Sequence, residues 1–106
     1  MLKLSICAET VYRHENFEGR IGKISENGMD TIEFWQWHDK NLKEIHDVLK
    51  QNHVNLLGFC VDSRNPKISE AISKTALNTD TADVLLKAVS ESIETAKYFG
   101  TKNLII

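Results

Sequence analysis

The sequence predicts an α/β fold in which four strands alternate with three helices. Apolar runs of strand length are separated by stretches whose apolar residues recur at helical spacing. Each intervening stretch is long enough for a right-handed crossover, so the strands are expected to pair in parallel with helices packed against the sheet. The chain has 106 residues, of which 42% are hydrophobic and 26% charged, with one proline. This length predicts a single domain, residues 1–106.

The first third of the chain predicts a strand, a helix and a second strand. Residues 2–8 form an apolar run with the length of a buried strand. A helix is predicted next by apolar side chains at helical spacing, at Phe17, Ile21 and Ile24. Asn27 and Gly28 mark its end, because glycine tolerates the left-handed backbone that closes a helix. Residues 31–35 are β-branched and aromatic, which predicts a strand.

The middle of the chain predicts a capped helix followed by a third strand. Asn41 and Glu44 have the spacing of a capping box, in which each side chain satisfies a free backbone N–H group. The helix that they begin is expected to end near Asn52. Residues 54–61 are almost continuously apolar, as in a strand that is covered on both faces.

The last third predicts a long polar connection over residues 62–80, one helix and a final strand. The helix is indicated by apolar residues at 3.6-residue spacing, at Leu85, Val89, Ile93 and Ala96. Gly100 lies beyond its last turn, and residues 102–106 begin a fourth strand. Two closures fit this strand–helix order: a small open α/β sheet, or the parallel half of a (β/α)8 TIM barrel.

Charge, hydropathy and cysteine content narrow the classes of function. The formal net charge is −2, which argues against nucleic acid as a partner because phosphate binding needs a clustered positive face. The apolar runs are too short for a membrane span, and the N-terminus lacks the features of a secretory signal, so a cytoplasmic location is expected. Cys7 and Cys60 have no metal-like spacing and are expected to be reduced, buried thiols.

Functional side chains are expected where strands run into helices, in the loops at residues 9–16, 36–40 and 62–80. Trp35, Trp37, His38 and Lys40 give the second of these regions the densest mixture of aromatic and titratable groups. Aromatic faces cover the C–H surface of a sugar while polar groups meet its hydroxyls, so these residues are predicted to bind a small polar ligand. Alternatively, the tryptophans cover the end of the sheet and the charges face water.

Carboxylates occupy three further positions of interest. Glu9 and Asp62 follow strands, where each could act as a general base, a metal ligand or a substrate contact, or could cap a helix or face solvent. Glu33 lies within a strand and is expected to form an ion pair or to face a polar interior. Cys60 is either a nucleophile or, more simply, a core residue. HExxH, CxxC, GxGxxG and GxSxG patterns are absent, so no metal ligand or catalytic residue is assigned.

Three segments resemble the hydroxypyruvate-isomerase-like branch of the xylose-isomerase-like TIM barrels. They are LSICAETVY at residues 4–12, the stretch from FEGRIGKISENG through EFWQWHDKNLKEI at residues 17–45, and SIETAKYFGTKNLII at residues 92–106. In particular, EFWQWHDKNL is similar to the aromatic passage between the second strand and second helix of that family. The resemblance favours the TIM-barrel closure and implies that the chain is the N-terminal half-barrel.

This resemblance implies an enzyme that isomerises or epimerises a sugar by proton transfer next to a carbonyl group. Two glutamates and, in many members, a divalent metal such as Mg or Mn supply the chemistry. These residues belong to the second half of the barrel and match no position here, so no catalytic residue and no metal ligand is transferred. Only the substrate-binding passage is carried over, namely Trp35, Trp37 and His38, together with Glu9 and Lys40. His38 departs from the aromatic residue common in relatives.

The main interpretation is a sugar isomerase or epimerase of which this chain alone is inactive. Two alternatives to it remain. The first is a non-catalytic half-barrel that self-associates as a homo-oligomer through its open sheet or completes a barrel with a partner, since an uncovered strand edge and sheet face favour association. The second is phosphodiester chemistry on damaged DNA, suggested by endonuclease relatives and disfavoured by the negative charge and the lack of metal-binding histidines. The predicted ligand is a small hydroxy-carbonyl compound or sugar.

Overall fold

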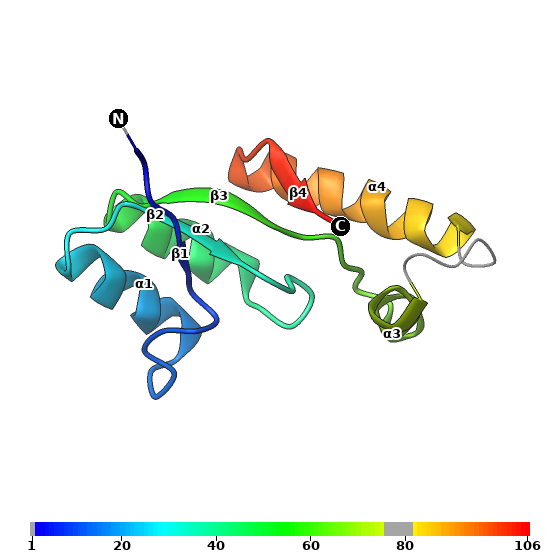
Figure 1. Cartoon of the computed structure of the whole chain (residues 1–106), viewed down its shortest axis with the longest axis horizontal. Helices are drawn as coiled ribbons and strands as arrows, with labels where there is room; N and C mark the ends of the chain where they lie inside the picture. Colours follow the sequence, from blue (N-terminus) through cyan, green and yellow to red (C-terminus); the bar gives the residue numbers. More distant parts are fainter. Residues whose placement is uncertain (1, 76–81) are drawn as a thin grey trace.

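A computed structural model describes residues 2–75 and 82–106, and in it four parallel strands form one sheet (Figure 1). The strands lie side by side in chain order and are β1 (Ile6–Cys7), β2 (Thr31–Phe34), β3 (Asn55–Cys60) and β4 (Asn103–Ile105). Each strand pairs in parallel with the next, and a register shift in β2 lies between Ile32 and Glu33. The predicted α/β order and the parallel pairing are therefore confirmed.

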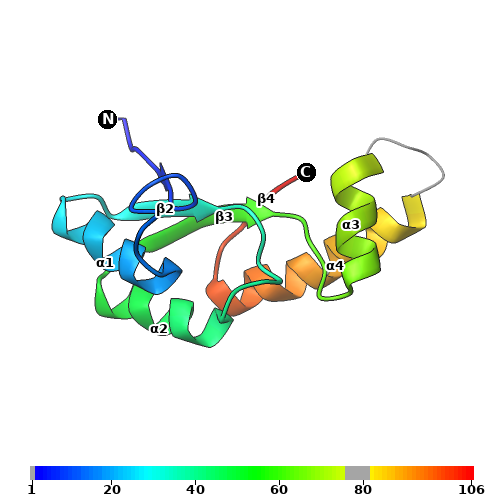
Figure 2. The ribbon, with the colours of Figure 1, turned by 90° about the horizontal axis from the view of Figure 1, so that it is seen from below.

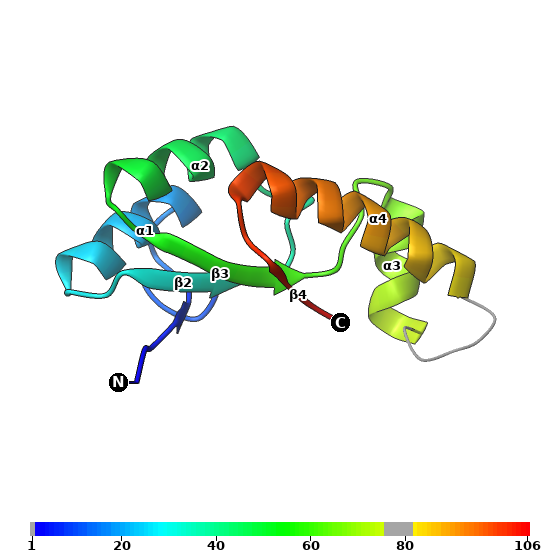
Figure 3. The ribbon, with the colours of Figure 1, turned by 90° about the horizontal axis from the view of Figure 1, so that it is seen from above.

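Four helices accompany the sheet: α1 (Phe17–Glu26), α2 (Leu42–Gln51), α3 (Pro66–Thr75) and α4 (Ala82–Phe99). Figures 2 and 3 show α1, α2 and α4 on one face of the sheet, with α3 beyond the end of β3 and next to α4. The other face of the sheet is covered by no helix of the described residues. The sheet consequently has one packed face and one open face.

The packed face is held together by phenylalanines from both strands and helices. Phe34 and Phe59 are fully buried, and their rings stack with centroids 5.4 Å apart. Phe99 of α4 meets both rings edge-on, and Phe17 of α1 meets Phe34 edge-on at 5.6 Å. Edge-to-face and offset contacts are the arrangements that aromatic quadrupoles favour, so this cluster holds four elements together: α1, β2, β3 and α4.

The predicted helix ends are largely confirmed. Asn41 accepts a hydrogen bond from the Glu44 N–H group at 3.2 Å, as an N-cap residue does. Gly28 and Gly100 follow α1 and α4 with φ angles of 84° and 76°, in the left-handed region that glycine occupies without strain. Gly58 serves a different purpose in β3, because a Cβ atom there would lie 2.7 Å from the Asn103 carbonyl oxygen. The close approach of β4 requires glycine at this position.

The predicted polar connection over residues 62–80 is wrong in its first part, because α3 occupies Pro66–Thr75. Proline suits the first helical position, where its missing N–H group costs nothing. The Asn65 side chain accepts a hydrogen bond from the Lys67 N–H group at 3.0 Å, and the Asn65 carbonyl accepts one from Ser69. The apolar stripe of this helix is too sparse to stand out in the sequence. Residues 76–80 of the connection lie outside the described residues.

The strands also differ from expectation in extent and burial. β1 is Ile6–Cys7 rather than residues 2–8, and Leu2 and Leu4 are exposed. Residues 54–61 were expected to be covered on both faces, yet Leu57 of β3 is 43% exposed. Glu33 has no ion-pair partner among the described residues. Within the same part of the chain, no helix combines the length and apolarity needed to cross a membrane.

Candidate functional site at the carboxyl ends of the strands

Hydrogen bonds tie the carboxyl ends of the first three strands together. The Glu9 side chain, beyond β1, accepts from the backbone N–H group of Trp35 at 3.3 Å. The Trp35 carbonyl in turn accepts from the Cys60 N–H group at 2.9 Å. Asp62, beyond β3, accepts from the N–H group of Trp37 at 3.1 Å. The three loops expected to carry function therefore do meet.

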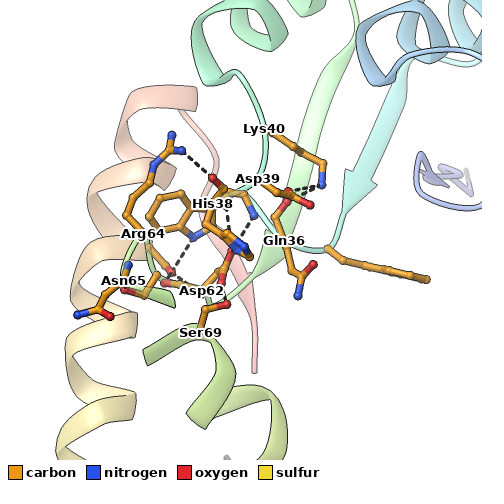
Figure 4. A network of polar contacts seen from close by, with 12 residues as sticks. Gln36, His38, Asp39, Lys40, Asp62, Arg64, Asn65 and Ser69 are labelled. Atoms are coloured by element: carbon orange, nitrogen blue, oxygen red, sulfur yellow. Dashed lines mark hydrogen bonds and ion pairs between the residues drawn. The ribbon is translucent and has the colours of Figure 1, made fainter. Parts of the chain in front are cut away.

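Asp62 is the centre of the polar network in Figure 4. Its side chain is 2% exposed. Oδ2 accepts hydrogen bonds from the backbone N–H groups of Trp37 and His38, at 3.1 and 2.9 Å. Oδ1 accepts from the Ser69 hydroxyl of α3 at 2.9 Å. Asp62 is therefore an internal hydrogen-bond acceptor, a role that was not among those expected from the sequence, and it does not face solvent.

The pKa of Asp62 reflects two opposing effects. Desolvation by burial raises the pKa because it disfavours the charged carboxylate. Hydrogen bonds from the His38 backbone and ring, the Ser63 backbone and the Ser69 hydroxyl outweigh this penalty, and the pKa of Asp62 lies below its ordinary value. Asp62 is therefore ionised at neutral pH.

The imidazole of His38 is held by this carboxylate. Nδ1 lies 2.5 Å from Asp62 Oδ2. An ionised carboxylate can only accept hydrogen bonds, so Nδ1 carries the proton. Arg64 fixes the same loop, since its Nη1 donates to the His38 carbonyl oxygen at 2.7 Å. The His38 side chain is 31% exposed, and no hydrogen bond from Nε2 to another described residue is present.

The two tryptophans of the predicted site have opposite environments. Trp35 is 53% exposed, whereas Trp37 is 3% exposed. The Trp37 indole donates to the Ser92 hydroxyl of α4 at 3.0 Å, and the Arg64 guanidinium lies 5.4 Å from its ring centroid. Ser92 also accepts from the Asp62 N–H group at 2.9 Å. Trp37 is thus part of the support beneath the loops, and Trp35 alone provides an exposed indole face.

Glu9 and Lys40, both predicted to contact substrate, form an ion pair with each other. Lys40 Nζ lies 2.6 Å from Glu9 Oε1, and the two side chains are only 7% and 17% exposed. The ammonium group also donates to the Gln36 carbonyl oxygen at 2.6 Å. It lies 4.9 Å from the ring centroid of Phe17 and 5.3 Å from that of Phe34. This pair joins the first two loops above the aromatic core.

A cavity of about 300 Å³ lies beside the network, between the strand ends and helices α3 and α4. Its walls include the apolar residues Trp35, Ile72, Leu85, Ile105 and Ile106. Cys60 and Asp62 also line it. Burial raises the pKa of the Cys60 thiol, which disfavours the nucleophilic thiolate. Cys7 and Cys60 are both free, as expected from the sequence, but both are half-buried rather than buried.

The described residues do not fit the divalent metal that the resemblance implies. Within residues 2–75 and 82–106, no group of three or more histidine, cysteine, aspartate or glutamate side chains is arranged to hold a metal ion. Asp62 offers its oxygens to protein donors, and His38 has one ring nitrogen engaged by Asp62.

Sequence reasoning missed three contributors to the network: Ser69, Ser92 and Arg64. Ser92 carried a usable signal, because it lies four residues after Ala88 on the buried stripe of α4 and is itself fully buried. A buried hydroxyl in an apolar stripe needs a hydrogen-bond partner, which here is Trp37 and the Asp62 backbone. Ser69 had no such signal, since its helix was not predicted.

Comparison with solved structures identifies the architecture. The crystal structure of an AP endonuclease, family 2, from Brucella melitensis matches with a TM-score of 0.81 at 17% sequence identity. The match covers 98% of this chain and 40% of that chain. The chain has the fold of half a TIM barrel. At this identity the likeness shows the fold alone. No protein-family model matches the sequence, and no curated protein matches it.

Proposed function

We propose that this half-barrel binds a small hydroxy-carbonyl compound or sugar, as part of a protein of the sugar isomerase or epimerase type that is most like hydroxypyruvate isomerase. One observation carries the proposal: the exposed indole of Trp35 and the fixed, partly exposed imidazole of His38 occupy one loop at the carboxyl ends of the strands. In TIM barrels this end of the strands carries the active site. The similarity of residues 33–42 to the aromatic passage of the isomerase family supports the same ligand class.

The two side chains suit complementary parts of such a ligand. The indole of Trp35 provides a flat apolar surface for C–H groups. His38 Nε2 can accept a hydrogen bond from a ligand hydroxyl group. The acid and base glutamates of the resembled family match no position in this sequence, so the expected behaviour of the chain alone is binding without isomerisation.

Nuclear magnetic resonance tests the binding site directly. The ¹H–¹⁵N spectrum of the chain is recorded while hydroxypyruvate or D-fructose is added. We expect saturable shifts for the Trp35 indole and for residues 36–40, with smaller shifts for the buried Trp37 indole. The absence of saturable shifts with both compounds, or shifts confined to the opposite end of the strands, contradicts the proposal.

A second candidate function, homo-oligomerisation, is favoured by the open sheet face. In a closed barrel the inner face of the sheet is filled by side chains, and here no helix of the described residues covers that face. Leu57 of β3 and Ile105 of β4 are 43% and 46% exposed. A second copy would bring the strands to the eight that a TIM barrel contains. Sedimentation of the wild-type chain and of a Leu57→Lys variant is the test. We expect a dimer that the substitution weakens, and a wild-type monomer at all concentrations rejects this function.

Action on abasic DNA, the substrate class named for the structural neighbour, is the disfavoured third reading. The net charge of −2 supplies little attraction for phosphates. A duplex containing an abasic site is accordingly expected not to bind in a fluorescence anisotropy titration at low salt. Saturable binding of that duplex would favour the endonuclease reading over the isomerase reading.

A further inference from the structure

The feature that carries a further inference is the asymmetry of the His38–Asp62 pair. Asp62 is almost fully buried, while about a third of the His38 side chain reaches the surface. Nδ1 faces the buried carboxylate, and Nε2 makes no hydrogen bond to another described residue. The pair therefore engages one ring nitrogen and leaves the other without a hydrogen-bond partner among the described residues.

Every donor around the Asp62 side chain favours a fixed carboxylate. Two backbone N–H groups, from Trp37 and His38, converge on Oδ2, and the Ser69 hydroxyl holds Oδ1. Rotation of the side chain would leave these buried donors without an acceptor, at a cost of about 1–3 kcal/mol each. The acceptor that faces His38 Nδ1 is thus held in one orientation by the 36–40 loop and α3.

We infer that Asp62 is a positioning residue, which fixes His38 as the Nδ1–H tautomer, so that His38 Nε2 accepts a hydrogen bond from a ligand hydroxyl group. This role rests on the proposed function, because it names the group that meets the hydroxy-carbonyl ligand. It also assigns different tasks to two residues that the sequence treats alike as candidate contacts.

In this tautomer Nε2 carries a lone pair and no proton, so it can accept a hydrogen bond but cannot donate one. A ligand hydroxyl group can donate that hydrogen bond, whereas a carbonyl oxygen cannot. Charged groups at the same end include Asp39, the Lys40 ammonium paired with Glu9, the Arg64 guanidinium bound to the His38 carbonyl oxygen and the Arg20 guanidinium bound to the Ala8 carbonyl oxygen.

The tautomer is measured first, on the free chain, from the ring nitrogen chemical shifts of His38 at alkaline pH. We expect the proton on Nδ1 in the wild-type chain. In Asp62→Asn, an amide oxygen replaces the charged acceptor, and both tautomers are expected. A predominant Nε2–H tautomer in the wild type, or an unchanged tautomer ratio in Asp62→Asn, overturns the inference. Neither result depends on a ligand, so this failure is distinct from failure of the proposed function.

Ligand binding is measured second, with hydroxypyruvate and D-fructose as probes. His38→Asn places an amide N–H group near the position of Nδ1 and removes Nε2. We expect this variant to fold and to bind about tenfold more weakly, the loss of one hydrogen bond. His14→Asn is the control, since the His14 side chain is 76% exposed away from the network. Unchanged affinity in a folded His38→Asn variant overturns the role of Nε2.

Discussion

Two acid–base pairs lie at the same end of the sheet and differ in what they leave exposed. In the Glu9–Lys40 pair, the basic side chain is 7% exposed and its ammonium is surrounded by Glu9, Asp39, a carbonyl oxygen and two phenylalanine rings. In the His38–Asp62 pair, the acid is buried and the base is 31% exposed. The first pair keeps its base buried among protein partners, whereas the second leaves the Nε2 atom of its base without a partner among the described residues. The comparison predicts that the Glu9–Lys40 pair stabilises the loops and that the His38–Asp62 pair binds the ligand.

The largest expected effect is the loss of Asp62. In Asp62→Ala, the backbone N–H groups of Trp37 and His38 and the hydroxyl of Ser69 lose their acceptor. We expect the free energy of unfolding to fall by about 3 kcal/mol or more, since each buried unpaired donor costs about 1–3 kcal/mol. Urea unfolding followed by tryptophan fluorescence measures this change. A loss below about 1 kcal/mol would show that the hydrogen bonds to Asp62 contribute little to the free energy of unfolding.

Removing the charge of Lys40 is expected to have a smaller effect on stability. Lys40→Met keeps most of the apolar stem and leaves Glu9 partly buried without its partner, which predicts a loss of about 1–2 kcal/mol. Lys43→Met is the matched control, because the Lys43–Asp47 pair is exposed and such pairs contribute about 0–1 kcal/mol. Equal losses of unfolding free energy in the two variants would mean that burial of the Glu9–Lys40 pair adds nothing to its contribution to stability.

Acid should weaken the contribution of Asp62 in a defined direction. Its pKa is lower in the folded chain than the unfolded value of about 3.9, so its stabilisation is present above that value and is lost as pH falls through the folded pKa. The difference in unfolding free energy between wild type and Asp62→Asn is therefore expected to shrink below about pH 4. If this difference in unfolding free energy grows on acidification, the lowered pKa of Asp62 in the folded chain is contradicted.

High salt distinguishes the stabilisation by buried Asp62 from the stabilisation by an exposed carboxylate. The hydrogen bond from Lys43 lowers the pKa of Asp47, which is an exposed group. Its contribution, measured with Asp47→Asn, is expected to vanish at about 1 M salt, where screening acts within about 3 Å. The contribution of buried Asp62 is expected to persist under the same conditions.

The smallest effect on stability is expected at Trp35. Its side chain is half exposed, so Trp35→Gln should change the free energy of unfolding by less than about 0.5 kcal/mol. The same substitution removes the apolar surface offered to a sugar, and affinity for D-fructose should fall several-fold. Trp37→Gln is the contrast, since burial of an amide in place of the indole should cost stability. A large stability loss at Trp35 would make it a core residue instead.

The strands, the three predicted helices and their parallel order could be predicted from the sequence because periodicity reports which side chains are buried. Helix α3 escaped prediction because its few apolar residues leave no clear stripe, and its capping by Asn65 is a local hydrogen-bond feature. The sequence placed Trp35, Trp37 and His38 in one loop but could not separate them. Burial of Trp37 depends on Ser92, which is 55 residues away along the chain.

The burial of Asp62 likewise could not be predicted from the sequence. Its position after β3 indicated an available carboxylate, and its burial follows from donors supplied by the 36–40 loop and by α3. Such convergence depends on tertiary structure, which a single sequence read by local pattern does not contain. The same holds for Glu9 and Lys40, whose mutual distance of 2.6 Å joins two loops.

The affinity of D-fructose for Lys40→Met and His38→Asn, measured side by side by ¹H–¹⁵N titration, tests the central claim most directly. The account predicts an affinity within about twofold of wild type for Lys40→Met and about tenfold weaker for His38→Asn. An equal loss in both variants would restore Lys40 as a ligand contact. Weaker binding in Lys40→Met alone would assign the ligand to the Glu9–Lys40 pair and contradict the account.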